Sequence, residues 1–64
     1  MKQEKLIQFR KSLKKTQEEM AKIWEISLSH YKKIECGIKN PSLEKIKMFT
    51  IKFPMANVED IFLT

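Results

Sequence analysis

Apolar residues recur along this chain at helical spacing, in short runs separated by polar turns. Leu6, Phe9 and Leu13 lie three and four residues apart with Lys and Arg between them, and they predict a first helix over residues 6–13. Apolar and polar residues alternate nowhere over a useful length, so no strand is expected. The expected core consists of Leu6, Phe9, Leu13, Met20, Ala21, Trp24, Ile26, Tyr31, Ile34, Leu43, Ile46, Phe49, Phe53, Val58 and Ile61, with Ile51 as a further candidate.

Side chains that can cap helices divide the chain further. Thr16 with Glu19 forms a capping box, in which each side chain accepts from the other's backbone N–H, so a second helix starts at Gln17. A third helix at 28–35 is expected between the cap Ser27 and the stop signal Gly37. A fourth helix follows the cap Ser42 and ends near Phe53, before Pro54. Asn57 is the expected cap of a last short turn of helix through Ile61 and Phe62. Five short helices in 64 residues predict one compact all-α domain spanning residues 1–64.

The stretch 17–34 carries the functional prediction. Two short helices are joined by the three-residue turn Glu25-Ile26-Ser27, and the small residue Ala21 lies where the second helix must cross closely. The apolar positions let the helices pack at a steep angle and leave the outer face of the second one polar. This is the helix-turn-helix arrangement, whose second helix lies in the major groove of DNA.

Several motifs occur together in a fixed order along the chain. They are Thr16-Gln17-Glu18-Glu19-Met20-Ala21, Ile26-Ser27-Leu28-Ser29, Tyr31-Lys32-Lys33-Ile34-Glu35-Cys36-Gly37, Asn40-Pro41-Ser42-Leu43-Glu44 and Val58-Glu59-Asp60-Ile61-Phe62. Over residues 6–62 the chain thereby resembles the lambda-repressor-like, or Cro/C1 (XRE) type, helix-turn-helix regulators of bacteria and phages. The resemblance implies a five-helix DNA-binding domain with its helix-turn-helix core at 16–36. The family usually has Gly in the turn where this chain has Glu25, a position that often takes a positive φ.

The resemblance also implies which residues contact DNA. Base edges would be read by Leu28, Ser29, Lys32 and Lys33, which share the face of the third helix opposite Tyr31 and Ile34. The alternative is a solvated face whose lysines contact phosphate only. Backbone contacts would come from Gln17 and from the loop residues Lys39 and Asn40, which are otherwise an ordinary helix start and turn. Ser27 and His30 complete the set of candidate DNA contacts. His30 lies at the edge of the face, and a lone exposed histidine more often has no functional role.

Two further expectations concern assembly of the domain. In the family an Arg late in the first helix commonly bridges a Glu at the end of the third, so the resemblance implies an ion pair between Arg10 and Glu35 that orients the third helix. Ile61, Phe62 and Leu63 offer more apolar surface than one small core needs, which suggests a dimer contact. Alternatively, all three close the core.

Charge and composition narrow the class of protein. Thirteen Lys and Arg against eight Asp and Glu give a net charge of +5, which favours a polyanionic partner, although charge also serves solubility. A single cysteine, Cys36, and a single histidine exclude a disulfide framework and a Cys/His zinc site within one chain, and no cofactor is expected. With no apolar run near the roughly 20 residues of a membrane span and no apolar signal core, we expect a cytoplasmic protein. The family resemblance implies a bacterial or phage origin.

These observations predict a sequence-specific DNA-binding transcriptional regulator, which we expect to be a repressor. Its partners would be double-stranded DNA and a second copy of the chain, and a domain of this length leaves no room to sense a small-molecule effector. No nucleophile–base pair, carboxylate dyad or phosphate-binding glycine loop suggests an enzyme. The alternative is a protein-interaction module of the same fold, such as an adaptor or an antitoxin with a toxin as its partner.

Overall fold

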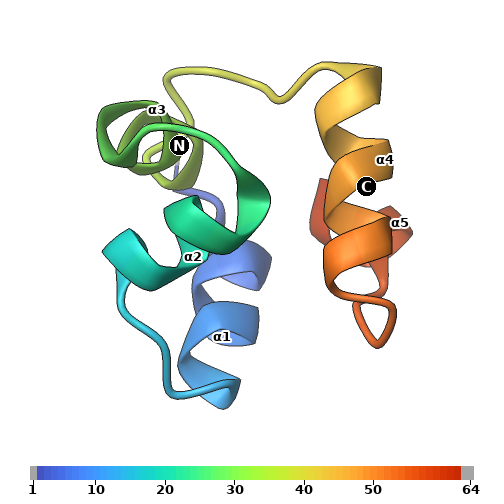
Figure 1. The fold of residues 1–64 in the computed structure, drawn as a ribbon. Helices are drawn as coiled ribbons and strands as arrows, with labels where there is room; N and C mark the ends of the chain where they lie inside the picture. Colours follow the sequence, from blue (N-terminus) through green and yellow to red (C-terminus); the bar gives the residue numbers. More distant parts are fainter. Residues whose placement is uncertain (1, 63–64) are drawn as a thin grey trace.

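The structure, a computed structural model, describes residues 2–62 and has five helices and no strand among them (Figure 1). The prediction of an all-α fold is therefore confirmed. The first helix begins two residues before the predicted start at residue 6. The apolar pattern could not mark Glu4 and Lys5, because both are polar, but Glu4 suits the positive end of the helix dipole. The helices are α1 (Glu4–Ser12), α2 (Gln17–Trp24), α3 (Leu28–Glu35), α4 (Leu43–Lys52) and α5 (Val58–Phe62).

The predicted caps fix where four of these helices start. The Thr16 hydroxyl accepts from the Glu19 N–H at 3.1 Å, and the Glu19 carboxylate accepts from the Thr16 N–H at 2.8 Å, which completes the capping box. The other three caps each accept from the backbone N–H three residues on: Ser27 from His30 at 3.1 Å, Ser42 from Lys45 at 3.3 Å and Asn57 from Asp60 at 3.2 Å. Each of these bonds satisfies an N–H that would otherwise have no partner within its helix, and so stabilises the helix start.

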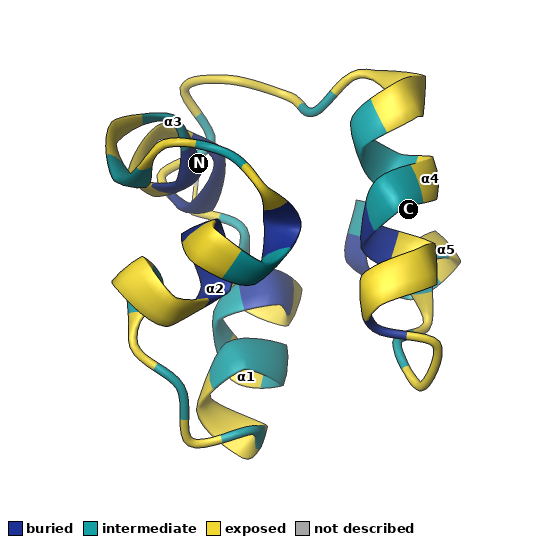
Figure 2. Ribbon diagram, viewed as in Figure 1, coloured by how far each residue is buried: buried dark blue, intermediate teal, exposed yellow. Residues whose placement is uncertain are grey.

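Trp24 lies at the centre of the core and ties the first three helices to the last two. Its side chain has no exposed surface, and its ring packs edge-on against Tyr31 of α3 and Phe49 of α4, with centroids 6.1 and 4.8 Å away. The indole N–H donates to the Lys45 carbonyl of α4 at 2.8 Å. Buried residues are drawn in dark blue along the ribbon in Figure 2. The other buried apolar residues of this core are Leu6, Met20, Ala21, Ile34, Phe53 and Ile61.

The predicted core was wrong at two positions of α4. Leu43 is 74% exposed and Ile51 is 72% exposed, whereas Phe49 is fully buried. Each residue advances the helix by about 100°, so two steps of three residues carry Leu43 about 120° away from Phe49, and Ile51 lies nearly opposite it. Met48 packs against the core instead, and Ile46 is only half-buried. The exposed face of α4 therefore carries apolar side chains.

The turn of the helix-turn-helix adopts the backbone conformation that glycine favours, without a glycine. Glu25 has φ 62° and ψ 41°, in the left-handed region, as the position was expected to require. Its carboxylate forms an ion pair with Lys52 at the end of α4, at 3.2 Å. The side chains of Lys52 and Glu25 are 37% and 58% exposed, so solvent screens this ion pair and it adds little to stability. The tight turn nevertheless brings α3 directly back across α2.

Candidate nucleic-acid interface

The outer face of α3 is polar because its inner face is fully used in packing. Tyr31 and Ile34 have no exposed surface, and α3 packs against α2 along this side. Ser29, Lys32 and Lys33 are exposed on the outer side. They therefore form the ridge of α3 that is free to meet a partner, with the half-buried Leu28 and His30 at its two edges.

Two open hollows flank this ridge. The first, of about 170 Å³, is called the His30 hollow here and is lined by Ser27, Ser29, His30, Lys33 and Lys39. The second, of about 420 Å³, is lined by Leu28, Ser29, Lys32 and Lys33. The fold thus gathers seven of the nine predicted DNA-binding residues along one surface, and leaves Gln17 and Asn40 outside the two hollows.

The loop after α3 brings Lys39 back to the end of α3. Gly37, with φ 81°, reverses the chain, and the backbone N–H groups of Ile38 and Lys39 both donate to the Lys33 carbonyl, at 3.0 and 3.2 Å. A side chain with a Cβ would disfavour this conformation at residue 37. The backbone of Lys39 is thereby held at the end of α3, and Lys39 lines the same hollow as Lys33, which sequence spacing alone did not predict.

Gln17 is bonded within the protein in this structure. Its side-chain amide donates to Glu35 Oε1 at 3.0 Å, so it links the start of α2 to the end of α3. This bond supports α3 from α2, and contact of Gln17 with phosphate stays a prediction. Asn40 is exposed in the loop, where the same holds for its predicted phosphate contact.

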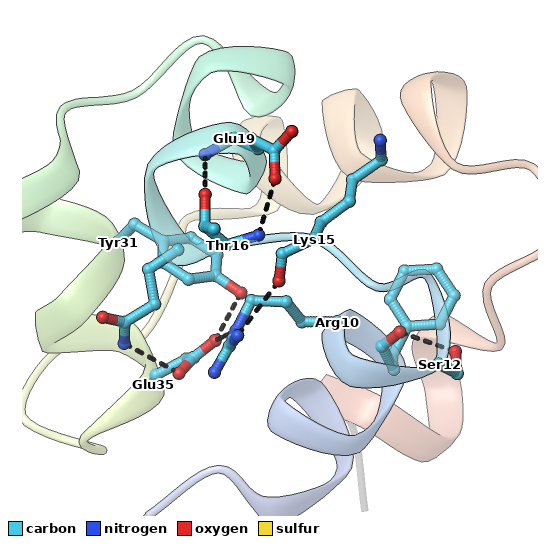
Figure 3. Close-up of polar contacts among 9 residues, drawn as sticks. Arg10, Ser12, Lys15, Thr16, Glu19, Tyr31 and Glu35 are labelled. Atoms are coloured by element: carbon cyan, nitrogen blue, oxygen red, sulfur yellow. Dashed lines mark hydrogen bonds and ion pairs between the residues drawn. The ribbon is translucent and has the colours of Figure 1, made fainter.

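The Glu35 carboxylate collects three donors at the end of α3 (Figure 3). Arg10 Nε donates to Oε2 at 2.8 Å, and the Tyr31 hydroxyl donates to the same oxygen at 2.5 Å. The predicted Arg10–Glu35 ion pair is therefore present, with side chains only 16% and 4% exposed. Arg10 Nη1 also donates to the Lys15 carbonyl at 3.1 Å. Together with Gln17, these residues form the Glu35 network, which fixes α3 against α1 and α2.

Ionisation in the Glu35 network is set by its hydrogen bonds. Burial by itself would raise the pKa of the Glu35 carboxyl, but the bonds from Arg10, Tyr31 and Gln17 outweigh burial and hold that pKa below its ordinary value. The bond to Glu35 raises the pKa of Arg10. Burial, followed by the bond to the Glu35 carboxylate, raises the pKa of the Tyr31 hydroxyl. At neutral pH the network is thus an anion held by one cation and two neutral donors.

The residues expected at a dimer contact are mostly used within the domain. Ile61 is 6% exposed and belongs to the core. Phe62 is half-buried, and its ring lies 5.2 Å from Phe49 and 5.8 Å from Trp24 between centroids. Leu63 lies outside the described residues. The alternative that this segment closes the core accounts for Ile61 in full, and a dimer contact through Phe62 stays a prediction.

One further hollow lies away from α3. A third hollow, of about 280 Å³, is lined by Lys15, Glu19, Lys22 and Ile23 on the outside of α2. Within residues 2–62 no group of three or more His, Cys, Asp or Glu side chains could hold a metal ion. No helix in that range is long and apolar enough to cross a membrane.

A helix-turn-helix whose second helix presents a polar outer face is typical of DNA-binding domains. A family model described as helix-turn-helix matches residues 6–49, which is more than half of the chain. The chain therefore belongs to the Cro/C1 (XRE) type of helix-turn-helix family, a family of DNA-binding regulators. Neither the comparison with curated proteins nor the comparison with solved structures gave a match.

Proposed function

We propose that this protein is a sequence-specific transcriptional repressor that inserts α3 into the major groove of its operator. The observation that carries the proposal is the ridge of Ser29, Lys32 and Lys33, exposed along α3 between two hollows while the Glu35 network fixes the helix behind it. Lysine ammonium groups donate to guanine O6 and N7, and a serine hydroxyl bonds several bases. Occupancy of an operator then blocks transcription.

The backbone of the operator would be held by the residues around this ridge. Lys39 and Asn40 would contact phosphate beside α3, and Gln17 would contact it at the start of α2. Neutralising phosphates releases counterions, so affinity falls steeply as the salt concentration rises. Two copies bound to a palindromic site would place their recognition helices about 34 Å apart, one turn of DNA.

Selection from a random duplex library with the purified protein tests this proposal. We expect enrichment of a two-fold symmetric motif whose half-site spacing reports the dimer. Lys33→Ala and Ser29→Ala should each weaken binding to the selected site by about 1–3 kcal/mol without changing the melting temperature, because both side chains are exposed. Lys47→Ala, which removes the same charge from an exposed position of α4, serves as a matched control. Wild-type affinity in both α3 variants would rule out base reading by this face.

A second candidate is a protein-interaction module, such as an adaptor or an antitoxin. The observation in its favour is the set of large apolar side chains left exposed beyond α3, which are Ile38, Leu43, Ile51 and Met55, at 66–74% exposure. A protein partner on α4 would cover Leu43 and Ile51 and leave the ridge of α3 free. This function is tested if the selection yields no motif even at low salt. A protein partner should then be captured by the wild type and lost in the control variant Leu43→Lys/Ile51→Lys.

A further inference from the structure

The hollow on the outside of α2 lies apart from the surface proposed to bind DNA. It has a volume of about 280 Å³ and is called the α2 hollow here. The residues that line it are Lys15, Glu19, Lys22 and Ile23. Two residues advance a helix by about 200°, so Glu19 points nearly opposite to Gln17, whose side chain reaches Glu35 of α3. The α2 hollow therefore opens away from the side of α2 that meets α3.

The walls of the α2 hollow are mostly apolar, although three of its four residues are charged. Ile23 is half-buried and packs against the core, and it contributes an aliphatic surface. The hydrocarbon stems of Lys15 and Lys22 add to this surface, because such stems can line a hollow while the ammonium groups stay in water. The volume is below the roughly 300–1,000 Å³ of small-molecule sites, so the hollow suits a single large side chain of a partner.

The positive charges of the α2 hollow are available to a partner, whereas its one negative charge is already engaged. Within residues 2–62 neither Lys15 nor Lys22 forms an ion pair. The Glu19 carboxylate accepts from the Thr16 N–H at 2.8 Å, and this bond holds the pKa of Glu19 below its ordinary value. The carboxylate thus serves to cap α2. What the hollow offers outward is an apolar wall bordered by two ammonium groups.

We propose that the α2 hollow docks an acidic segment of another protein, which places one apolar side chain against Ile23 and carboxylates on Lys15 and Lys22. The charge of this surface is complementary to that of such a segment, and the net charge of +5 attracts it from a distance. Phosphate could pair with the lysines, but the DNA backbone has no apolar group to bury against Ile23. The inference goes beyond DNA binding and does not require it. Since the hollow opens away from α3, the segment and a duplex are held at the same time.

Selection from a library of random displayed peptides tests the chemistry of the segment. The library is first passed over Lys15→Glu/Lys22→Glu, which removes peptides that bind the ridge of α3 or the exposed face of α4. It is then selected on the wild-type protein. We expect the retained peptides to combine Asp or Glu with a large apolar residue. If no peptide is retained, or if the retained peptides lack acidic residues, the inference is wrong.

Changes in both partners measure the contact. A retained peptide is labelled with a dye, and its anisotropy is titrated with protein. Replacing its apolar residue by Ser should weaken binding about tenfold or more, because that side chain leaves water on docking. Lys22→Glu should weaken binding about three- to tenfold, whereas Lys47→Glu, the same charge reversal on the exposed face of α4, should change it less than about twofold. Equal effects of the two reversals would show attraction to net charge only and would overturn docking in the hollow. Melting curves check that both variants are folded.

Binding to DNA separates this inference from the proposed function. Lys22→Glu and Lys47→Glu should bind the selected duplex equally, and the labelled peptide should stay bound when the duplex is added. If Lys22→Glu alone loses affinity for the duplex, or if the duplex displaces the peptide, the α2 hollow belongs to the DNA-binding face and the inference is wrong while the function stands. If no variant binds any duplex, the DNA-binding function fails, and the peptide titration still decides whether the α2 hollow docks an acidic segment.

Discussion

Removal of the Glu35 carboxylate should destabilise this domain more than any other single change in a polar side chain. In Glu35→Ala, the guanidinium of Arg10 loses a bond of 2.8 Å and the buried Tyr31 hydroxyl loses one of 2.5 Å. Breaking a buried ion pair on one side costs about 3–5 kcal/mol. The lower end applies here, because Arg10 is 16% exposed and keeps its bond to the Lys15 carbonyl.

A loss of about 3 kcal/mol is large for a chain of 64 residues. At about 0.05–0.15 kcal/mol per residue the whole domain is stable by only about 3–10 kcal/mol. In a domain of this size each kcal/mol shifts the melting temperature by about 4–8 °C, so Glu35→Ala should melt about 12–24 °C below the wild type. Thermal melting followed by far-ultraviolet circular dichroism measures this shift, and urea unfolding gives the free energy directly.

The double variant Arg10→Met/Glu35→Leu separates the unpaired charge from the network as a whole. It removes both charges and fills the space with apolar groups, so it should be less destabilised than the sum of Arg10→Met and Glu35→Leu, by about 1–3 kcal/mol. The Tyr31 hydroxyl still lacks its partner in this variant, which leaves a residual cost of about 1 kcal/mol. A loss below about 1 kcal/mol in Glu35→Ala, or strict additivity in the double variant, would refute the reasoning from burial.

Three further predictions concern stability. The pKa of Glu35 is held below its ordinary value of 4.5, so the contribution of this carboxylate to the free energy of unfolding is complete above pH 4.5 and is lost as the pH falls through the lowered pKa. Acid unfolding should therefore depend less on pH in Glu35→Gln than in the wild type. Glu25→Gly should raise the free energy of unfolding in urea by up to about 1 kcal/mol by relieving the left-handed backbone, and a clear loss would show that the ion pair with Lys52 matters more than the strain. Thr16→Ala should lower it by about 1 kcal/mol through loss of the capping box, against a near-neutral exposed control, Lys22→Ala, and equal values for the two would contradict the role of the cap.

Local signals predicted the elements of this fold well because a cap and its helix lie within four residues of each other. Thr16, Ser27, Ser42 and Asn57 all cap helices as expected. The outward position of Leu43 could not be predicted in the same way, because the phase of a helix relative to the core depends on where the other helices lie.

Local sequence patterns predicted part of the candidate site, and the rest came from the family resemblance or became visible only in the three-dimensional structure. The ridge of α3 follows from the helical spacing of its residues, and the Arg10–Glu35 pair came from the family resemblance rather than from any local pattern. Tyr31 lies four residues before Glu35, so its bond to that carboxylate was within reach of the sequence, but its aromatic ring suggested only a core position. The pairing of Gln17 with Glu35 and the approach of Lys39 to Lys33 required the three-dimensional arrangement.

The position of Trp24 gives the protein a built-in optical probe. It is the only tryptophan in the chain, it has no exposed surface, and its ring contacts α3, α4 and α5 through Tyr31, Phe49 and Phe62. Its emission should shift to longer wavelength as soon as the last two helices separate from the first three. A duplex on the outer ridge of α3 would leave the indole in its dry surroundings, so intrinsic fluorescence follows unfolding without responding to occupancy of the DNA-binding face.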